Sequence, residues 1–187
     1  VSYEMEFPIT RFGGQRIWIR TKADAVKDGE RVIRVVGNIQ DITERKQAEQ
    51  AIRFSEEKWR SLFETCPAGI ALANAQGEFL DANPAYLAQL GYTRDEMAKI
   101  RYQDYTPPKW HEQEAQNVVQ LKASGAPMYF EKEHIRKDGT VFPVALTGWI
   151  IRDGSGSPGT LGVFVMDISE RKHAEEALRE SESKYRL

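Results

Sequence analysis

The chain has 187 residues, of which 41% are hydrophobic and 10% aromatic, and its 26 Lys and Arg nearly balance 28 Asp and Glu, for a net charge of −2. This aromatic content and balanced charge exclude a disordered chain and argue against a nucleic-acid-binding surface, so we expect no nucleic-acid partner. The single cysteine excludes an internal disulfide, and no apolar run reaches the roughly 20 residues that span a bilayer. We therefore expect a cytoplasmic segment without direct membrane contact.

A sequence of about twenty residues occurs twice. Residues 41–60 read DITERKQAEQAIRFSEEKWR and residues 167–186 read DISERKHAEEALRESESKYR. Upstream of each copy, residues 11–19 (RFGGQRIWI) align with residues 136–144 (RKDGTVFPV). Internal similarity at this spacing indicates an array of domains. Since the chain begins with Val1, we expect it to be a piece of a longer protein with tandem domains.

The repeat predicts how the chain is divided. We expect four segments, which in chain order are the C-terminal strands of a preceding domain (1–43), a linker helix (44–64), a complete domain (65–169) and the start of the next linker helix (170–187). Residues 44–64 contain no Gly or Pro and are rich in Glu, Lys, Arg, Gln and Ala, which favour a helix. Thr43 is suited to the N-cap, and the Cys66-Pro67 pair ends this helix.

Strands and helices alternate in the first half of the complete domain. Residues 69–74 (GIALAN) and 78–82 (EFLDA) predict two short strands around a Gln76-Gly77 turn. Asn83 as cap and Pro84 at the first position predict a helix to about Gly91. We expect two further helices, at residues 94–99 and 109–123.

The second half of the domain has the period of strands. Residues 128–137 and 140–152 flank Asp138-Gly139, a strong hairpin signal because both residues tolerate positive φ. Residues 153–159 (DGSGSPG) predict a flexible surface loop, and residues 160–168 the final strand. Two strands, several helices and three strands predict an α+β domain on a five-stranded antiparallel sheet.

Three stretches resemble the PAS sensor domain with its C-terminal PAC segment. They are residues 77–97 (GEFLDANPAYLAQLGYTRDEM), 134–146 (HIRKDGTVFPVAL) and 162–172 (GVFVMDISERK). The resemblance covers residues 55–170 as one domain and 1–45 as the end of another. It implies a PAS-like sheet with helices on one face, flanked by long signalling helices. It also implies a sensory or dimerisation module of a bacterial signalling protein, of the sensor histidine kinase or diguanylate cyclase type.

The sequence holds no catalytic motif. It has no Gly-rich phosphate loop, no phospho-acceptor histidine in a kinase-like context and no nucleophile–base pair. We expect the segment not to be an enzyme, and any catalysis to belong to an output domain elsewhere in the parent.

Cofactors are also disfavoured. Haem-binding PAS domains carry an axial histidine on the long helix, whereas His111 stands about one turn too early, and we expect His134 on the surface of its strand. Cys66 precedes Pro67 at the domain entrance, unlike the flavin-reactive cysteine of light-sensing PAS relatives. No His, Cys or carboxylate spacing suits a metal. We expect no tightly bound haem, flavin or metal, and the sequence leaves the ligand unknown.

One face of the strand at residues 140–152 is apolar and could line a cavity closed by the helices, as in PAS domains. The candidate cavity residues are Leu90, Trp110, Leu121, Phe130, Val144 and Leu146. The alternative is a filled core without a ligand. Trp149 lies on the opposite face of the same strand and needs cover from a helix or a second subunit.

Two further sets of residues concern signalling and assembly. Asp41 and Asp167 end strands while Thr43 and Ser169 begin helices, and in the family this junction is thought to carry the signal. The linker helix has a heptad seam, spaced 4-3-4-3, that consists of Ala48, Ile52, Ser55, Trp59 and Leu62. We expect a parallel homodimer through this seam and Trp149, beside adjacent PAS and output domains.

Two hypotheses follow for function. The first is a sensory module that binds a small molecule in its core and passes the signal through the flanking coiled-coil helices. The second is a ligand-free dimerisation and relay module.

Overall fold

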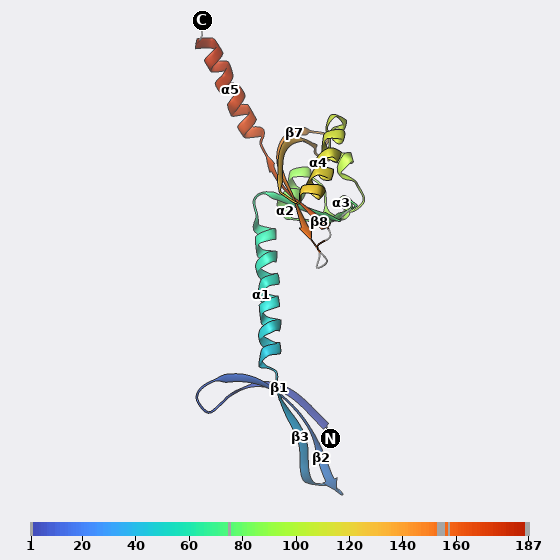
Figure 1. Cartoon of the computed structure of the whole chain (residues 1–187), viewed down its shortest axis with the longest axis vertical. Coiled ribbons are helices and arrows are strands. Elements are labelled where there is room, and N and C mark those ends of the chain that lie inside the picture. The colour runs from blue at the N-terminus through green and yellow to red at the C-terminus, as the bar shows by residue number, and fades with distance from the viewer. Residues whose placement is uncertain (1, 75, 153–155, 157, 186–187) are drawn as a thin grey trace. The chain divides into compact units, whose positions relative to one another are not determined.

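The computed structural model describes residues 2–74, 76–152, 156 and 158–185, which fall into two compact units, residues 1–60 and 61–187 (Figure 1). The expected loop at 153–159 lies mostly outside the described residues, as do the last two residues of the expected helix at 170–187. Among the helices so described, none is long and apolar enough to span a membrane.

The first unit contains a three-stranded antiparallel sheet. Its strands lie in the order β1 (Ser2–Thr10), β2 (Arg16–Asp28) and β3 (Arg31–Asp41). Ile17, Ile19 and Ala23 are buried at alternate positions of β2. Every residue of β3 is exposed, including the apolar side chains of Val35 and Ile39. The sheet therefore leaves apolar side chains of β3 uncovered within this unit.

Helix α1 spans Thr43–Thr65, within a residue of the expected bounds at each end. It has an acidic residue, Glu44, in its first turn, where the helix dipole favours a negative charge. Phe63 is its one buried residue, so the rest of the helix is held by its own backbone hydrogen bonds and by ion pairs such as Arg53–Glu57.

The second unit is built on a five-stranded antiparallel sheet. Its strands, in spatial order, are β5 (Phe79–Ala82), β4 (Gly69–Asn74), β8 (Pro158–Asp167), β7 (Val141–Arg152) and β6 (Met128–Ile135). Figure 1 shows the short helices gathered on one side of this sheet: α2 (Pro84–Leu90), α3 (Arg94–Met97) and α4 (His111–Ser124). Helix α5 (Ser169–Tyr185) follows β8 directly. The expected α+β class and strand number are confirmed.

Two 3-10 turns, which the sequence did not predict, precede α4. They are η1 (Tyr102–Tyr105) and η2 (Pro108–Trp110), and they contain or adjoin Pro107 and Pro108. Proline lacks the amide donor that an α-helix interior needs, so the chain enters α4 at His111, two residues later than expected.

Asn83 fixes the start of α2 against the sheet. It is completely buried, and its Oδ1 accepts hydrogen bonds from the amides of Ile70 (2.8 Å) and Tyr86 (3.0 Å). Its Nδ2 donates to the carbonyl oxygens of Ala68 (2.9 Å) and Cys66 (3.3 Å). One side chain thereby caps the helix and joins it to the strand, as expected for an N-cap asparagine.

The core lies between the sheet and the helices. It consists of Ala71, Ala82, Tyr86, Leu90, Met97, Phe142, Val144, Leu146 and Val165. On the opposite face of the sheet, the Trp149 ring lies over Gly162 and 4.7 Å from the Phe164 ring, between centroids. A Cβ at Gly162 would come within 2.3 Å of the indole, so the tryptophan occupies space that only glycine leaves open.

We expect Gly162→Ala to lower the free energy of unfolding by about 1–3 kcal/mol, because the new methyl group displaces the Trp149 ring. Chemical denaturation followed by circular dichroism measures the effect. In a Trp149→Ala background, Gly162→Ala should change the free energy of unfolding little, because the ring that would clash is absent. If Gly162→Ala lowered the free energy of unfolding equally in both backgrounds, a clash with the Trp149 ring would not be the cause of the loss.

Candidate ligand cavity and signal junctions

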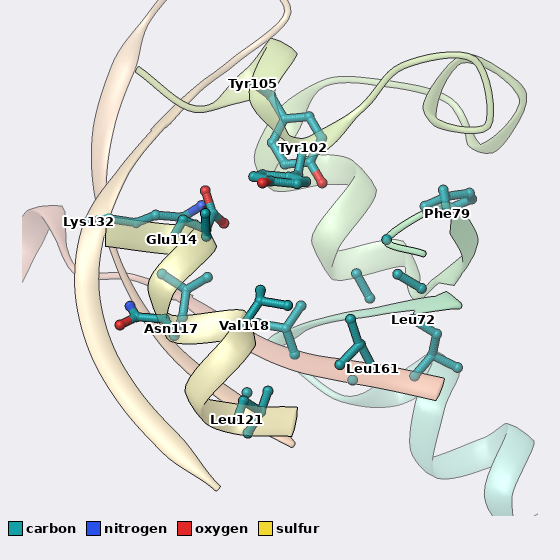
Figure 2. Close-up of a pocket in the computed structure, with 18 of the residues that line it drawn as sticks. Leu72, Phe79, Tyr102, Tyr105, Glu114, Asn117, Val118, Leu121, Lys132 and Leu161 are labelled. Carbon is teal, nitrogen blue, oxygen red and sulfur yellow. The ribbon is translucent and has the colours of Figure 1, made fainter. Parts of the chain in front are cut away.

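A cavity of about 340 Å³ lies between the sheet and α4 in the second unit. Its volume is near the lower end of small-molecule sites, which span about 300–1,000 Å³. Figure 2 shows one end formed by apolar side chains from both layers, among them Leu72, Phe79, Val118, Leu121 and Leu161. The other end carries Lys132, Glu114, Asn117, Tyr102 and Tyr105 (Figure 2).

The six residues expected to line a cavity divide into three groups. Leu121, Phe130 and Leu146 lie in its wall. Leu90 and Val144 are completely buried in the packed core and are not among the lining residues. Trp110 is half-buried in η2, where its Nε1 donates to Glu133 Oε2 at 3.3 Å, and it too is outside the lining.

A buried ion pair forms the polar end of the cavity. The side chain of Lys132 is 1% exposed and that of Glu114 is 12% exposed, and the Lys132 ammonium donates to Glu114 Oε1. It also donates to Thr106 Oγ1 at 3.0 Å. Because a buried charge is tolerated only when paired and hydrogen-bonded, this pair holds β6 against α4.

His134 lies inside the domain, so the expectation that it is on the surface is wrong. It is 1% exposed and lines the cavity two residues after Lys132. In the β6–β7 register Lys132 lies opposite Val144 and His134 opposite Phe142, which places both polar residues on the inward face. The expectation missed them because strand alternation shows which residues share a face, not which face is buried.

Three buried polar atoms in the cavity wall have no hydrogen-bond partner among the described residues. They are Glu114 Oε2, Asn117 Nδ2 and His134 Nδ1. Buried polar atoms are nearly always hydrogen-bonded in folded proteins, and leaving one unpaired costs about 1–3 kcal/mol. All three atoms have almost no accessible surface, so they face the surrounding protein and not the space of the cavity.

The ionisable groups beside the ion pair are held uncharged. Burial, together with the Lys132 ammonium, lowers the pKa of His134 well below its usual value. Burial raises the pKa of Tyr105 to about 12 and that of Tyr86 well above its usual value. The His134 ring packs edge-on against the rings of Tyr86, Tyr105 and Phe142, with centroids 5.5–6.4 Å apart.

These residues do not fit a haem. The histidine in the cavity wall, His134, packs against three aromatic rings, and its Nδ1 has almost no accessible surface from which to bind an iron. His111 lies at the start of α4 with its Nε2 2.8 Å from the Thr106 carbonyl oxygen. Cys66 is outside the cavity lining. Within the described ranges, no three His, Cys, Asp or Glu side chains are grouped to hold a metal ion.

The junction from β8 to α5 is a compact hydrogen-bonded turn. Asp167 Oδ1 accepts from the Ser169 amide (2.9 Å) and hydroxyl (2.6 Å), and its Oδ2 accepts from Arg136 Nη2 at 2.7 Å. Partial burial by itself would raise the pKa of Asp167, but the bonds from Ser169 and Arg136 outweigh it and lower that pKa. The carboxylate thus joins the β6–β7 hairpin to the first turn of α5.

The first unit contains the same junction. Asp41 Oδ1 accepts from the Thr43 amide (3.0 Å) and hydroxyl (2.6 Å), and Arg11 Nη2 donates to Asp41 Oδ2 at 2.9 Å. The Thr43 hydroxyl oxygen also accepts from the amide of Trp18 at 2.9 Å. The corresponding position in the second unit is Pro143, which has no amide hydrogen, so that bond cannot form there.

A second contact holds each helix to its sheet, and we call it the carboxylate clamp. In the second unit Glu131 of β6 binds Arg171 at 2.6 Å and Lys172 at 2.8 Å, in the first turn of α5. In the first unit Glu6 of β1 binds Arg45 at 2.6 Å and Lys46 at 2.7 Å, in the first turn of α1. Hydrogen bonds from Arg171, Lys172 and Tyr129 lower the pKa of Glu131 to about 2.

The residues of the expected dimer seam all lie on the exposed surface of α1. They are Ala48, Ile52, Ser55, Trp59 and Leu62. Trp149 lies partly covered on the outer face of the sheet, next to exposed Phe164 and Met166.

The second unit is thus a five-stranded antiparallel sheet with short helices and a cavity on one face, and a further helix follows its last strand. Residues 2–44 and 67–170 match the family described as PAS domain, and the chain belongs to that family. It is a sensory domain of signal-transduction proteins, and the PAS domain itself is not catalytic.

Named relatives agree with this assignment. The chain is 29% identical to the sensor histidine kinase TmoS of Ectopseudomonas mendocina over 136 residues, which are 72% of this chain and 14% of that protein. It is 25% identical to the sensor protein FixL of Bradyrhizobium diazoefficiens over 187 residues, 97% of this chain and 37% of that protein. The chain thus spans much less than two thirds of either relative.

A solved structure supports the fold alone. The PAS domain of a protein from Colwellia psychrerythraea has a TM-score of 0.58 and 16% identity to this chain, and the match covers 61% of this chain and 97% of that one.

We expect His134 to make the folded state sensitive to acid. Its folded pKa lies below the unfolded value of about 6.5, so the unfolded chain binds the proton first as the pH falls. This contribution to stability is complete above about pH 6.5 and is lost below it, by up to about 1.4 kcal/mol per pH unit. Urea unfolding between about pH 7.5 and 5 should therefore show a steeper loss for the wild type than for His134→Gln.

The matched control for this measurement is His173→Gln, because His173 is exposed on α5. It should keep the pH dependence of the wild type. If His134→Gln and the wild type lost stability in parallel, His134 would not be a buried neutral base.

Proposed function

We propose that the second unit is a ligand-binding sensory module that reports the occupancy of its cavity to α5. The observation that supports this is the cavity of about 340 Å³, whose wall has an apolar end and, at the other end, the buried ion pair of Lys132 and Glu114. A ligand with an apolar body would move its surface from water into the apolar end, which stabilises the complex in proportion to the area buried. A filled core would leave no such space.

Strand β6 offers a direct route from the cavity to α5. Lys132 faces inward to Glu114, and the preceding residue, Glu131, faces outward to Arg171 and Lys172. Since adjacent residues of a strand point to opposite faces, a shift of β6 caused by a ligand at Lys132 moves the clamp on the other side. The Asp167 junction ties the same helix to the β6–β7 hairpin.

The relay extends to the neighbouring domains of the parent. The junction at Asp41 and Thr43 would deliver a signal into α1, and that at Asp167 and Ser169 would deliver it out through α5. A helix turns about 100° per residue, so a small rotation at its first turn changes which face meets a partner. We take the parent to be a cytoplasmic sensor histidine kinase, on the likeness to TmoS, or a diguanylate cyclase.

A second candidate is a ligand-free dimerisation and relay module. Exposed apolar side chains support it: Ile52, Trp59 and Leu62 are 61%, 51% and 59% exposed in α1, at heptad spacing with Ala48 and Ser55. Phe164 and Met166 beside Trp149 form a further apolar surface. A parallel homodimer would cover these side chains, and it is compatible with a ligand in the cavity.

The first candidate predicts a bound small molecule in the purified chain. Native mass spectrometry should show added mass that is lost on denaturation. Val118→Trp fills the cavity and should abolish that mass, whereas Val119→Trp, on the exposed side of the same helix, should retain it. A wild type that carries no added mass and forms a dimer would favour the second candidate.

The relay predicts a specific role for the clamp. Glu131→Gln removes the charge that holds Arg171 and Lys172, so the amides in the first turn of α5 should exchange hydrogen faster, by several-fold. Glu133→Gln is the matched control, because Glu133 lies two residues along β6 and binds Lys109 instead of α5. If both variants exchanged like the wild type, the clamp would not hold the helix.

A further inference from the structure

Gly148 of β7 lies in the floor of the cavity and has no side chain to fill it. Alternate residues of a strand share a face, and those that precede Gly148 on the inward face are large and buried: Phe142, Val144 and Leu146. Gly148 is buried as well, and in the strand register it lies opposite Val163 of β8. Both residues of this pair line the cavity. The floor therefore has a gap in its side chains at Gly148.

The backbone does not require glycine at this position, because the φ of Gly148 is outside the positive range that favours glycine. Apart from adjacent residues, the atoms nearest to a Cβ built there would be Leu121 Cδ2 at 3.3 Å and the Gly162 carbonyl oxygen at 4.0 Å. The end of a leucine side chain can relieve the first contact by a small shift. At Gly162, in contrast, a Cβ would come within 2.3 Å of the Trp149 ring. What glycine provides at position 148 is therefore open space between the sheet and α4.

The side chains around this space are apolar. Val118 and Leu121 of α4 and Leu161 of β8 lie at the end of the cavity away from Lys132 (Figure 2). Such a space favours a hydrocarbon body, because apolar surface moved into it from water is stabilised in proportion to its area. An apolar cavity of about 150 Å³ holds one benzene ring. The cavity of about 340 Å³ therefore has room for a body of two rings.

Resting on the proposed function, we propose that Gly148 sets the size of the apolar ligand body that the cavity admits. One ring of a two-ring body lies in the space between Gly148 and Leu121, and a single ring binds without that space. Gly148 is thus a specificity-determining residue, and it acts by leaving room that any other residue would fill.

Two hydrocarbon probes test this size limit: benzene, with one ring, and biphenyl, with two. Equilibrium dialysis of the whole chain against each probe gives the two affinities. Gly148→Val should weaken the binding of biphenyl at least about tenfold, because the valine side chain occupies the space for its second ring. The affinity for benzene should change by less than about threefold. Retained benzene binding also shows that the variant is folded around an intact cavity.

A compensating variant and a matched control locate the effect. Adding Leu121→Ala to Gly148→Val should restore the affinity for biphenyl to within about threefold of the wild type, because the shorter side chain returns the space that the valine takes. Thr147→Val introduces the same side chain one residue earlier, on the outer face opposite Phe164. It should leave both affinities unchanged.

The outcomes separate this inference from the proposed function. If biphenyl bound Gly148→Val as tightly as the wild type, or if the valine weakened both probes equally, Gly148 would not select ligands by size, while ligand binding in the cavity would stand. If neither probe bound the wild type, the inference would also be wrong. Added mass in the native mass spectrum that is lost in Val118→Trp would still uphold the proposed function, and its absence from the wild type would overturn that function as well.

Discussion

The ammonium group of Lys132 is the charge around which the second unit is arranged. A lysine that is 1% exposed at its side chain needs an anion at bonding distance, and Glu114 supplies it from α4. Burial lowers the pKa of Lys132, while the carboxylate of Glu114 opposes that shift. The position of α4 over the sheet is therefore constrained by charge as well as by apolar packing, and the cavity lies beside this pair.

Strand β6 is used on both faces. Its inward residues, Phe130, Lys132 and His134, contribute to the cavity wall, and its outward residues Glu131 and Glu133 bind α5 and η2. A strand that is packed on one face and charged on the other is common at a sheet edge. Here the charged residues of β6 have specific partners. A displacement of the strand would therefore move the cavity wall and the contacts with α5 together.

The junction and the clamp occur in both units, although the first unit holds only a three-stranded sheet in the described residues. Asp41 with Thr43 and Glu6 with Arg45 make the same contacts as Asp167 with Ser169 and Glu131 with Arg171. In both units these contacts join a strand of the sheet to the first turn of the helix that follows the sheet. A repeated local structure of this kind can connect domains of an array irrespective of what each one binds.

The sequence by itself determined the secondary structure, the fold class and the places where chain segments join. The Asp138-Gly139 turn, the Asn83 cap and the duplicated Asp-Ile-Ser/Thr stretch are local signals, because a few adjacent residues set the backbone angles and hydrogen bonds there. They located the hairpin, the start of α2 and the two junctions within a residue or two.

Only the tertiary structure decided which residues form the cavity. Leu90 and Val144 have the same apolar character as Leu121 and Leu146, yet the first two fill the core and the others line the cavity. The partner of Lys132 lies 18 residues earlier in the chain. Whether a lysine on a strand is buried depends on such a carboxylate being brought to it by helix packing, and no local pattern records that contact.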